Sequence, residues 1–130
     1  MSVTDLSNQY CHFEDDDAFV ETERPGFRRR VITGEHLQLC FWRIKGGSTG
    51  SFLHHHDANE QLGVIARGKL DFRIGSGTEL DERVVLGEGE IYLAPPGIDH
   101  GDSVFIGDDE LDECWIIDVF SPPRNDLAET

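Results

Sequence analysis

The stretch from residue 27 to residue 121 consists of short apolar segments separated by turns that are rich in glycine and proline. Such turns include Lys45-Gly46-Gly47, Gly87-Glu88-Gly89 and Pro95-Pro96-Gly97. Short segments at this spacing, without helical periodicity, predict an all-β sandwich or barrel. The strands are expected at residues 36–44, 61–67, 69–75, 83–86, 90–94, 103–106 and 113–120. Gly68 is expected to form a tight turn between two of them.

The chain divides into three parts by composition. Its 130 residues fit one domain, and a hydrophobic content of 38% is enough for a core. Residues 1–26 are polar and end at Pro25-Gly26, which indicates an N-terminal arm. We expect a β-barrel over residues 27–121 and a C-terminal tail over residues 122–130.

The charge balance limits the partners. The net charge is −15, from 26 acidic and 11 basic residues, so phosphate backbones and anionic membranes would be repelled. We therefore expect no nucleic-acid or membrane partner. The basic run at residues 28–30 is expected to pair with the acidic run at residues 14–17, within one protomer or across a dimer.

The N-terminus has no basic start and no apolar stretch, and no apolar run approaches the roughly 18 residues of a membrane span. A cytoplasmic protein is expected. Cys11, Cys40 and Cys114 are an odd number without CxxC spacing, which argues against a disulfide framework. Cys40 and Cys114 lie within apolar segments and are expected to be buried thiols.

Three of the six histidines stand side by side in "HHHDANEQ", residues 54–61. Side chains alternate between the two faces of a strand, so His54 and His56 would point the same way and His55 the opposite way. Two imidazoles on one face can bind one metal ion. Glu60 and Gln61 follow, and His100 stands after a Pro-Pro-Gly turn, so further ligands are at hand.

These residues resemble the two motifs of the cupin superfamily. His54, His56, Gln61 and Gly68 match the spacing of the first motif, with Gln in the place of Glu and the opening glycine off by one, at Gly47. The second motif is matched by Gly89, Pro95, Gly97 and His100, and only its final Asn is replaced, by Val104. The resemblance implies a cupin-type jelly-roll β-barrel.

The resemblance also implies a metal held by His54, His56, Gln61 and His100. Gln61 is preferred to Glu60 because its distance from Gly68 fits the motif and Glu60 would face the other side of the strand. The exchange of Glu for Gln removes one negative charge, so the metal keeps its full Lewis acidity. We expect a divalent transition metal, namely Fe, Ni, Zn, Mn, Co or Cu.

The last expected strand and its tail, "DVFSPPRND" (118–126), form a second informative stretch. Asp118 lies among apolar residues and is a candidate acid or base pointing into the barrel, with a structural pairing to Arg124 as the alternative. This ending resembles that of small cupins that linearise unsaturated uronates from pectin and alginate. That resemblance implies proton transfer by Asp118, a substrate carboxylate held by Arg124, and a pocket shaped by Phe120.

The first expectation for function is therefore a metal-dependent isomerase acting on a small oxygenated acid such as an unsaturated uronate. The alternatives are an Fe-dependent dioxygenase, a polyketide-type cyclase or dehydratase, and a non-catalytic cupin module that binds a metal and a ligand. An acidic chain needs interior arginines to bind an acid, and Arg43, Arg67 and Arg73 are candidates besides Arg124. Tyr92 is a candidate hydrogen-bond donor to the pocket, with simple packing as the alternative. We also expect a homodimer.

Overall fold

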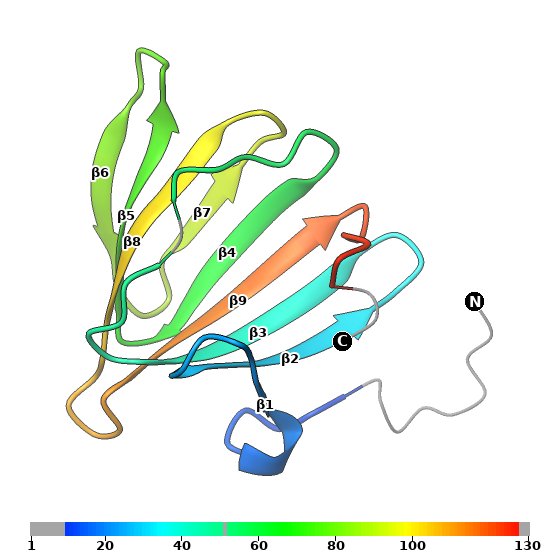
Figure 1. Cartoon of the computed structure of the whole chain (residues 1–130), viewed down its shortest axis with the longest axis vertical. Coiled ribbons are helices and arrows are strands. Elements are labelled where there is room, and N and C mark those ends of the chain that lie inside the picture. The colour runs from blue at the N-terminus through cyan, green and yellow to red at the C-terminus, as the bar shows by residue number, and fades with distance from the viewer. Residues whose placement is uncertain (1–9, 51, 128–130) are drawn as a thin grey trace.

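The computed structural model describes residues 10–50 and 52–127. It contains nine strands and one short 3-10 turn, η1, and no α-helix is present in these ranges (Figure 1). No helix in this part of the chain is long and apolar enough to cross a membrane. The elements are η1 (Asp16–Ala18), β1 (Val20–Glu21), β2 (Phe27–Thr33), β3 (Gln38–Lys45), β4 (Glu60–Arg67), β5 (Lys69–Ser76), β6 (Glu82–Leu86), β7 (Ile91–Ala94), β8 (Asp99–Ile106) and β9 (Glu113–Ser121).

The strands form two antiparallel sheets that face each other. The larger sheet has the order β1-β2-β3-β9-β4-β7, and the smaller has the order β6-β5-β8. In Figure 1 the smaller sheet stands at the left and the larger sheet curves away from it. The prediction of an all-β jelly-roll fold is thus confirmed. β8 begins at Asp99, four residues before the segment expected at 103–106.

Gly68 marks the point where the chain passes between the sheets. β4 pairs with β7 and β9, whereas β5 pairs with β6 and β8, so the two strands that flank Gly68 do not form a hairpin. Its φ of +72° is readily adopted only by glycine, and a Cβ there would overlap the backbone of Ile106. The expected tight turn is present, but it connects two sheets.

The main core lies between the sheets. Ile65, Phe72, Phe105 and Ile116 are at most 8% exposed and meet there, because alternate residues of each strand face inward. Cys114 belongs to the same cluster and is fully buried, as predicted. Apolar burial of this kind provides the main stabilisation of such a fold.

A second cluster covers the outer face of the larger sheet. Phe19, from the segment before β1, packs edge-to-face on Phe41 at a ring distance of 5.1 Å. Arg43 is only 6% exposed and pairs with Asp16 at 2.6 Å and with Glu113 at 3.0 Å. Part of the expected N-terminal arm is therefore attached to the barrel by apolar contacts and by the ion pair of Asp16 with the buried Arg43. Arg28 also lies 3.8 Å from Asp16, so one residue from each of the two predicted charge runs is paired.

Candidate functional site

Three histidines meet at one end of the cavity between the sheets. The segment that carries His54 and His56 is not a regular strand, but His54 forms an isolated bridge with His100 at the start of β8. Their backbones exchange hydrogen bonds of 2.9 and 2.8 Å. This bridge aligns the segment so that the metal-binding atoms of the three side chains lie within 4.8 Å of one another.

Backbone carbonyls fix the orientation of two of these rings. Nδ1 of His54 lies 2.9 Å from the carbonyl oxygen of Phe52, and Nδ1 of His100 lies 3.1 Å from that of Ile98. Because a carbonyl oxygen only accepts, each of these contacts is a hydrogen bond when the ring proton is on Nδ1. In that tautomer Nε2 carries a lone pair, as a metal ligand requires.

The ring of His56 and the pKa values of His56 and His100 also meet the requirement for a nitrogen with a free lone pair. Nε2 of His56 is buried without a hydrogen-bond partner of normal geometry in the part of the chain described. Burial, the positive charge of Arg124 and the other two rings lower the pKa of His56 to about 4. Burial also lowers the pKa of His100. Both rings are therefore neutral at pH 7, which is the form that binds a metal.

The Gln61 side chain completes this end of the cavity. Gln61 is 5% exposed, and its Oε1 lies 3.2 Å from Nε2 of His100, whereas Glu60 is exposed. Nδ1 of His100 faces the Ile98 carbonyl and Nε2 faces this amide oxygen, so a neutral ring can donate to only one of the two acceptors. When the proton is on Nδ1, a cation between Nε2 and Oε1 would be coordinated by both atoms. The donor set of three imidazoles and one amide oxygen fits a divalent transition metal.

Tyr92 links this set to Asp118. The Gln61 Nε2 donates to the Tyr92 hydroxyl at 2.8 Å, and that hydroxyl donates to Asp118 Oδ1 at 2.8 Å. Because Nε2 of Gln61 is engaged in this way, its Oε1 must face the histidines. Burial, which outweighs the hydrogen bonds from Tyr92 and Gln61, raises the pKa of Asp118 to about 6. Of the two alternatives left open for Tyr92, both are present: the half-buried side chain donates a hydrogen bond at the cavity and also packs on Phe72 at a ring distance of 4.9 Å.

These side chains line one cavity of about 400 Å³. Phe120 is 2% exposed and sits edge-on to His56, with ring centroids 5.7 Å apart. The Arg124 guanidinium lies 5.0 Å above the Phe120 ring and pairs with Asp126 at 2.6 Å. The structural pairing of Asp118 with Arg124, considered from sequence, is not among the ion pairs of the described residues.

Several residues that the sequence analysis considered for the site do not line the cavity. His55 points away from the cavity and sits between Asp99 at 2.8 Å and Asp57 at 3.1 Å, and these contacts raise its pKa. None of the other three candidate interior arginines lines the cavity: Arg43 is in the outer cluster, Arg67 pairs with Asp108, and Arg73 pairs with Asp81.

Sequence reasoning missed Arg24, which lines the cavity from the turn before β2. Its guanidinium lies 4.2 Å over the ring of Phe27 and donates to the carbonyl of Thr49 at 2.7 Å. The sequence-based division placed Arg24 in the N-terminal arm. Only the pairing of β1 with β2 brings it to the cavity, and nothing in its local pattern signals that position.

Comparison with known proteins supports the fold. A model of the cupin domain family matches residues 40–112, which is more than half of the chain. No curated protein sequence matches. Among solved structures, KdgF from Halomonas sp. is 25% identical with a TM-score of 0.69, over 82% of this chain and 88% of that one.

Two further structures share the fold. An RmlC-like cupin from Shewanella frigidimarina NCIMB 400 is 23% identical with a TM-score of 0.70, over 92% of this chain and 97% of that one. Oxalate decarboxylase from Bacillus subtilis, which has Mn(II) centres, is 20% identical with a TM-score of 0.65, over 82% of this chain and 28% of that one.

Proposed function

The chain belongs to the cupin family, and on this premise we propose that it is a metal-dependent isomerase acting on a small oxygenated acid such as an unsaturated uronate. The single observation that carries the proposal is the shared cavity. The three histidines and Gln61 line it together with Asp118, a buried carboxyl whose pKa lies near neutrality, and with Arg124. The similarity to KdgF and the Asp118-x-Phe120-x3-Arg124 ending support the same assignment.

His54, His56, His100 and Gln61 would hold the metal. A divalent cation bound there supplies a Lewis acid that polarises a carbonyl or hydroxyl oxygen of the substrate. The Nδ1 hydrogen bonds of His54 and His100 hold both rings with Nε2 directed at one position. Tyr92 holds the Gln61 amide so that its oxygen, rather than its nitrogen, faces that position.

Asp118 would transfer the proton. Opening the ring of an unsaturated uronate moves one proton from a hydroxyl oxygen to a ring carbon while the ring C–O bond breaks, so the product is an isomer. A carboxyl with a pKa of about 6 exists in both protonation states near neutral pH and can therefore accept and return a proton. The Tyr92 hydroxyl, at 2.8 Å, keeps Asp118 in one orientation during both steps.

Arg124 would bind the substrate carboxylate. Its guanidinium is fixed over Phe120, and its Nε and Nη2 atoms hold Asp126 at 3.1 and 2.6 Å. Asp126 is exposed, so a substrate carboxylate can replace it or share the remaining N–H groups. Phe120 provides an apolar wall beneath the same guanidinium.

The experiment is to load the purified protein with divalent metals one at a time and add a 4,5-unsaturated galacturonate. We expect the ultraviolet absorbance of the ring double bond to disappear without uptake of oxygen. Asp118→Asn is expected to retain its metal and to lose about 100-fold or more in rate, the usual contribution of a positioned acid or base.

Other outcomes would contradict the proposal. Oxygen uptake with Fe(II) would indicate a dioxygenase. Tight binding without turnover would indicate a non-catalytic module. Elimination of water or closure of a new ring would indicate a dehydratase or cyclase. Unchanged absorbance with every metal would exclude the proposed reaction on this substrate.

A further inference from the structure

A second cavity, of about 590 Å³, lies beside the first. It is formed by residues from β1, β2 and the turn between them, together with Trp42 of β3. Thr22, Arg24 and Trp42 line both cavities, so the two are neighbours that share one wall. The residues that line the second cavity are Val20, Glu21, Thr22, Glu23, Arg24, Arg29, Arg30, Val31 and Trp42.

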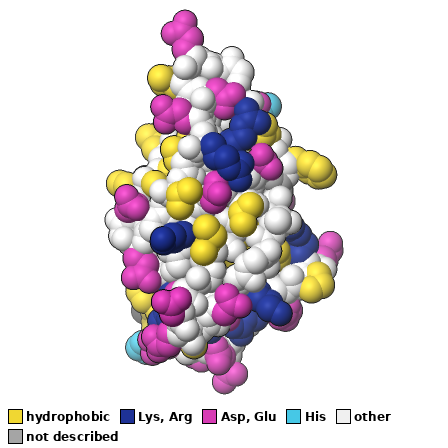
Figure 2. Space-filling model, turned by 90° about the vertical axis from the view of Figure 1, so that its left-hand side faces the viewer, with side chains coloured by type: hydrophobic (Ala, Val, Ile, Leu, Met, Phe, Trp, Pro, Cys, Tyr) yellow, Lys and Arg dark blue, Asp and Glu magenta, His cyan; other side chains and the backbone are white. Residues whose placement is uncertain are grey.

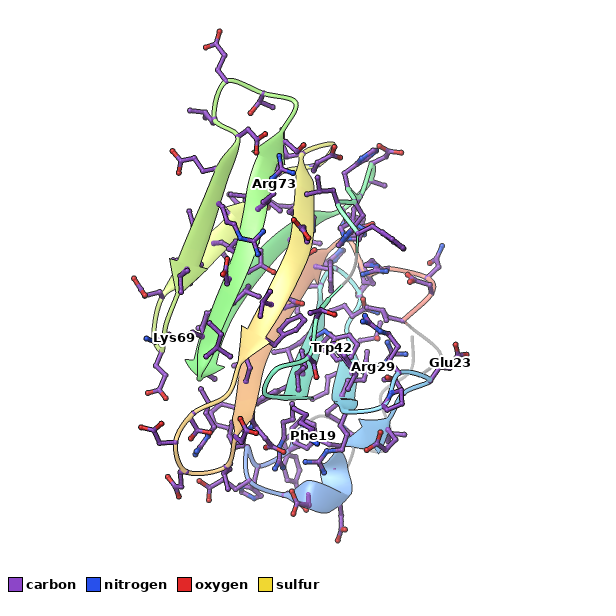
Figure 3. The ribbon with its side chains drawn as sticks, turned by 60° about the vertical axis from the view of Figure 1, so that its left-hand side comes forward. Phe19, Glu23, Arg29, Trp42, Lys69 and Arg73 are labelled. Carbon is purple, nitrogen blue, oxygen red and sulfur yellow. The ribbon has the colours of Figure 1, made fainter. Side chains whose placement is uncertain are left out.

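Arg29 is brought to this cavity by the register of the larger sheet. Phe27 and Val31 of β2 both pack into interior clusters, and Arg29 lies between them on the same face of the strand. It stands directly opposite Trp42 of β3, and its guanidinium lies 5.4 Å above the indole ring. Figure 3 shows Arg29 beside Trp42, with Glu23 toward the outer edge.

Arg29 differs from most arginines of this chain in its charge partners. On the face formed by β6 and β5, basic and acidic side chains are interleaved (Figure 2), and Arg73 and Arg83 both form ion pairs there. Arg29 is in none of the ion pairs formed by residues 10–50 and 52–127. A half-buried guanidinium without a charge partner among the described residues, in a chain with a net charge of −15, is available to an external anion.

We propose that Arg29, Arg24 and Trp42 form a second binding site, which takes the carboxylate of a small organic acid next to the metal-binding cavity. A guanidinium placed over an indole ring can offer two N–H groups to the two oxygens of a planar carboxylate. The uncovered part of the Trp42 ring provides a surface for the carbon skeleton of the same acid.

The charges around the cavity favour a singly charged acid. The register places Arg30 opposite Phe41 and Glu21 opposite Arg28, on the outer face of the sheet. The other charged lining residues are Arg24, Arg29 and Glu23, whose charges sum to +1. A phosphate, with up to two negative charges, would be repelled by Glu23 more strongly than a carboxylate. A monoanionic sugar acid or ring acid is therefore the class of ligand that this cavity fits.

The shared wall explains how such a site would serve the first cavity. A chain with this net charge repels acids, and a positively charged site beside the first cavity raises their local concentration. The same chemistry would suit a separate acid that binds only at the second cavity. The inference concerns binding alone, so it does not require the reaction proposed above.

The experiment titrates metal-free, chelator-treated protein and metal-loaded protein with D-galacturonate while tryptophan fluorescence is recorded. Trp42 and Trp115 are the two tryptophans of the chain, and Trp115 is 4% exposed and lines neither cavity, so a change in signal reports on Trp42. D-galactose, which lacks the carboxylate, is the control ligand. Arg73→Gln is the control variant, since it removes the same charge on the other sheet (Figure 3).

We expect galacturonate to change the signal in the metal-free protein and galactose to have no effect. Arg29→Gln is expected to weaken the binding by about tenfold or more, because a charge-assisted hydrogen bond contributes this order of affinity. Arg73→Gln should bind like the unaltered protein. Equal affinity in Arg29→Gln, or binding that exists only with metal, would overturn the proposal even if the isomerase activity is found.

Kinetics of the metal-loaded protein distinguish the two possible ligands of the second cavity, which are the uronate substrate and a separate acid. If the acid passes from the second cavity to the first, Arg29→Gln raises KM for the uronate and makes it less dependent on salt, while kcat stays unchanged. If a separate acid is the ligand, galacturonate binds at the second cavity and KM for the uronate is the same in both proteins. Both results support the site and assign its ligand.

Discussion

The Tyr92 hydroxyl donates a hydrogen bond of 2.8 Å to Oδ1 of Asp118, and both groups are buried in the wall of one cavity. The same hydroxyl accepts a hydrogen bond from Gln61, so one phenol group orients a metal-binding amide and a carboxyl group. The proposed proton-transfer residue and the proposed metal position would thereby be coupled through a single side chain.

Replacing Tyr92 by Phe should shift the pH dependence of activity. The hydrogen bond lowers the pKa of Asp118, which burial raises to about 6, so its loss moves that pKa further up. The acid limb of the rate profile should therefore move to higher pH, and the free energy of unfolding should fall by about 1–3 kcal/mol. Tyr10→Phe is the matched control, because Tyr10 is the other tyrosine and is 67% exposed. An unchanged profile in Tyr92→Phe would contradict the coupling.

Metal content should separate Gln61 from Glu60. Gln61→Ala removes the amide oxygen that faces His100 and is expected to lower metal affinity by at least about tenfold, the loss typical of removing even an outer partner of a ligand. Glu60→Ala removes an exposed side chain and should leave the affinity unchanged. Elemental analysis after dialysis measures both. The reverse result would assign the fourth ligand to Glu60.

Gly63 should be intolerant of even one methyl group. A Cβ at this position would overlap the ring of Tyr92, whose own strand pairs with β4 directly opposite. Gly63→Ala is therefore expected to displace the phenol, lower the free energy of unfolding by about 1–3 kcal/mol and reduce activity. Gly87→Ala is the control, because a Cβ there meets only ordinary van der Waals contacts. Equal urea midpoints for the two variants would disprove this expectation.

Glu113 should make stability depend on pH in the acid range. Burial alone would raise its pKa, but hydrogen bonds from Trp115 and Arg43 and the charges of Arg43 and Arg28 lower it below the ordinary value of 4.5. A lowered pKa means that the folded state favours the charged form of Glu113. The resulting stabilisation of the folded state is therefore present above pH 4.5 and is lost as the pH falls through the pKa of Glu113 in the folded protein.

The variant Glu113→Gln tests the direction in which the free energy of unfolding changes with pH. Its free energy of unfolding should lie about 1–3 kcal/mol below that of the unaltered protein at neutral pH, since it loses charge-assisted hydrogen bonds. The two curves should converge as the pH falls, whereas Glu110→Gln, on an exposed side chain, should follow the unaltered protein throughout. A constant difference over the whole pH range would refute the assignment.

The strands that flank the site were predictable because their signal is local. Alternating apolar residues between turn signals located β4, β5 and β9 to within a residue or so of their bounds, and the two histidine motifs pointed to the three histidines that lie together in the structure. The spacing of these residues along the sequence is set within each strand. It is therefore the same in any arrangement of the two sheets.

The other features of the fold and the site depend on contacts between segments that are far apart in the sequence. The position of Arg24 follows from the pairing of β1 with β2, and the burial of Arg43 follows from its contact with Asp16 and Glu113. The dual role of Tyr92 requires Gln61 and Asp118 to lie on either side of it in space. The alternation of apolar residues in a single sequence gives no information about such contacts.

β9 lies between β3 and β4 in the larger sheet, and it supplies Asp118 and Phe120. On a ribosome, every earlier strand would thus emerge before the one that fills the gap between them. Until then the edges of β3 and β4 are unpaired and can associate with other chains. A shortened polypeptide that ends before Glu113 is expected to accumulate as aggregate, and chaperone dependence during synthesis should be greatest in this interval.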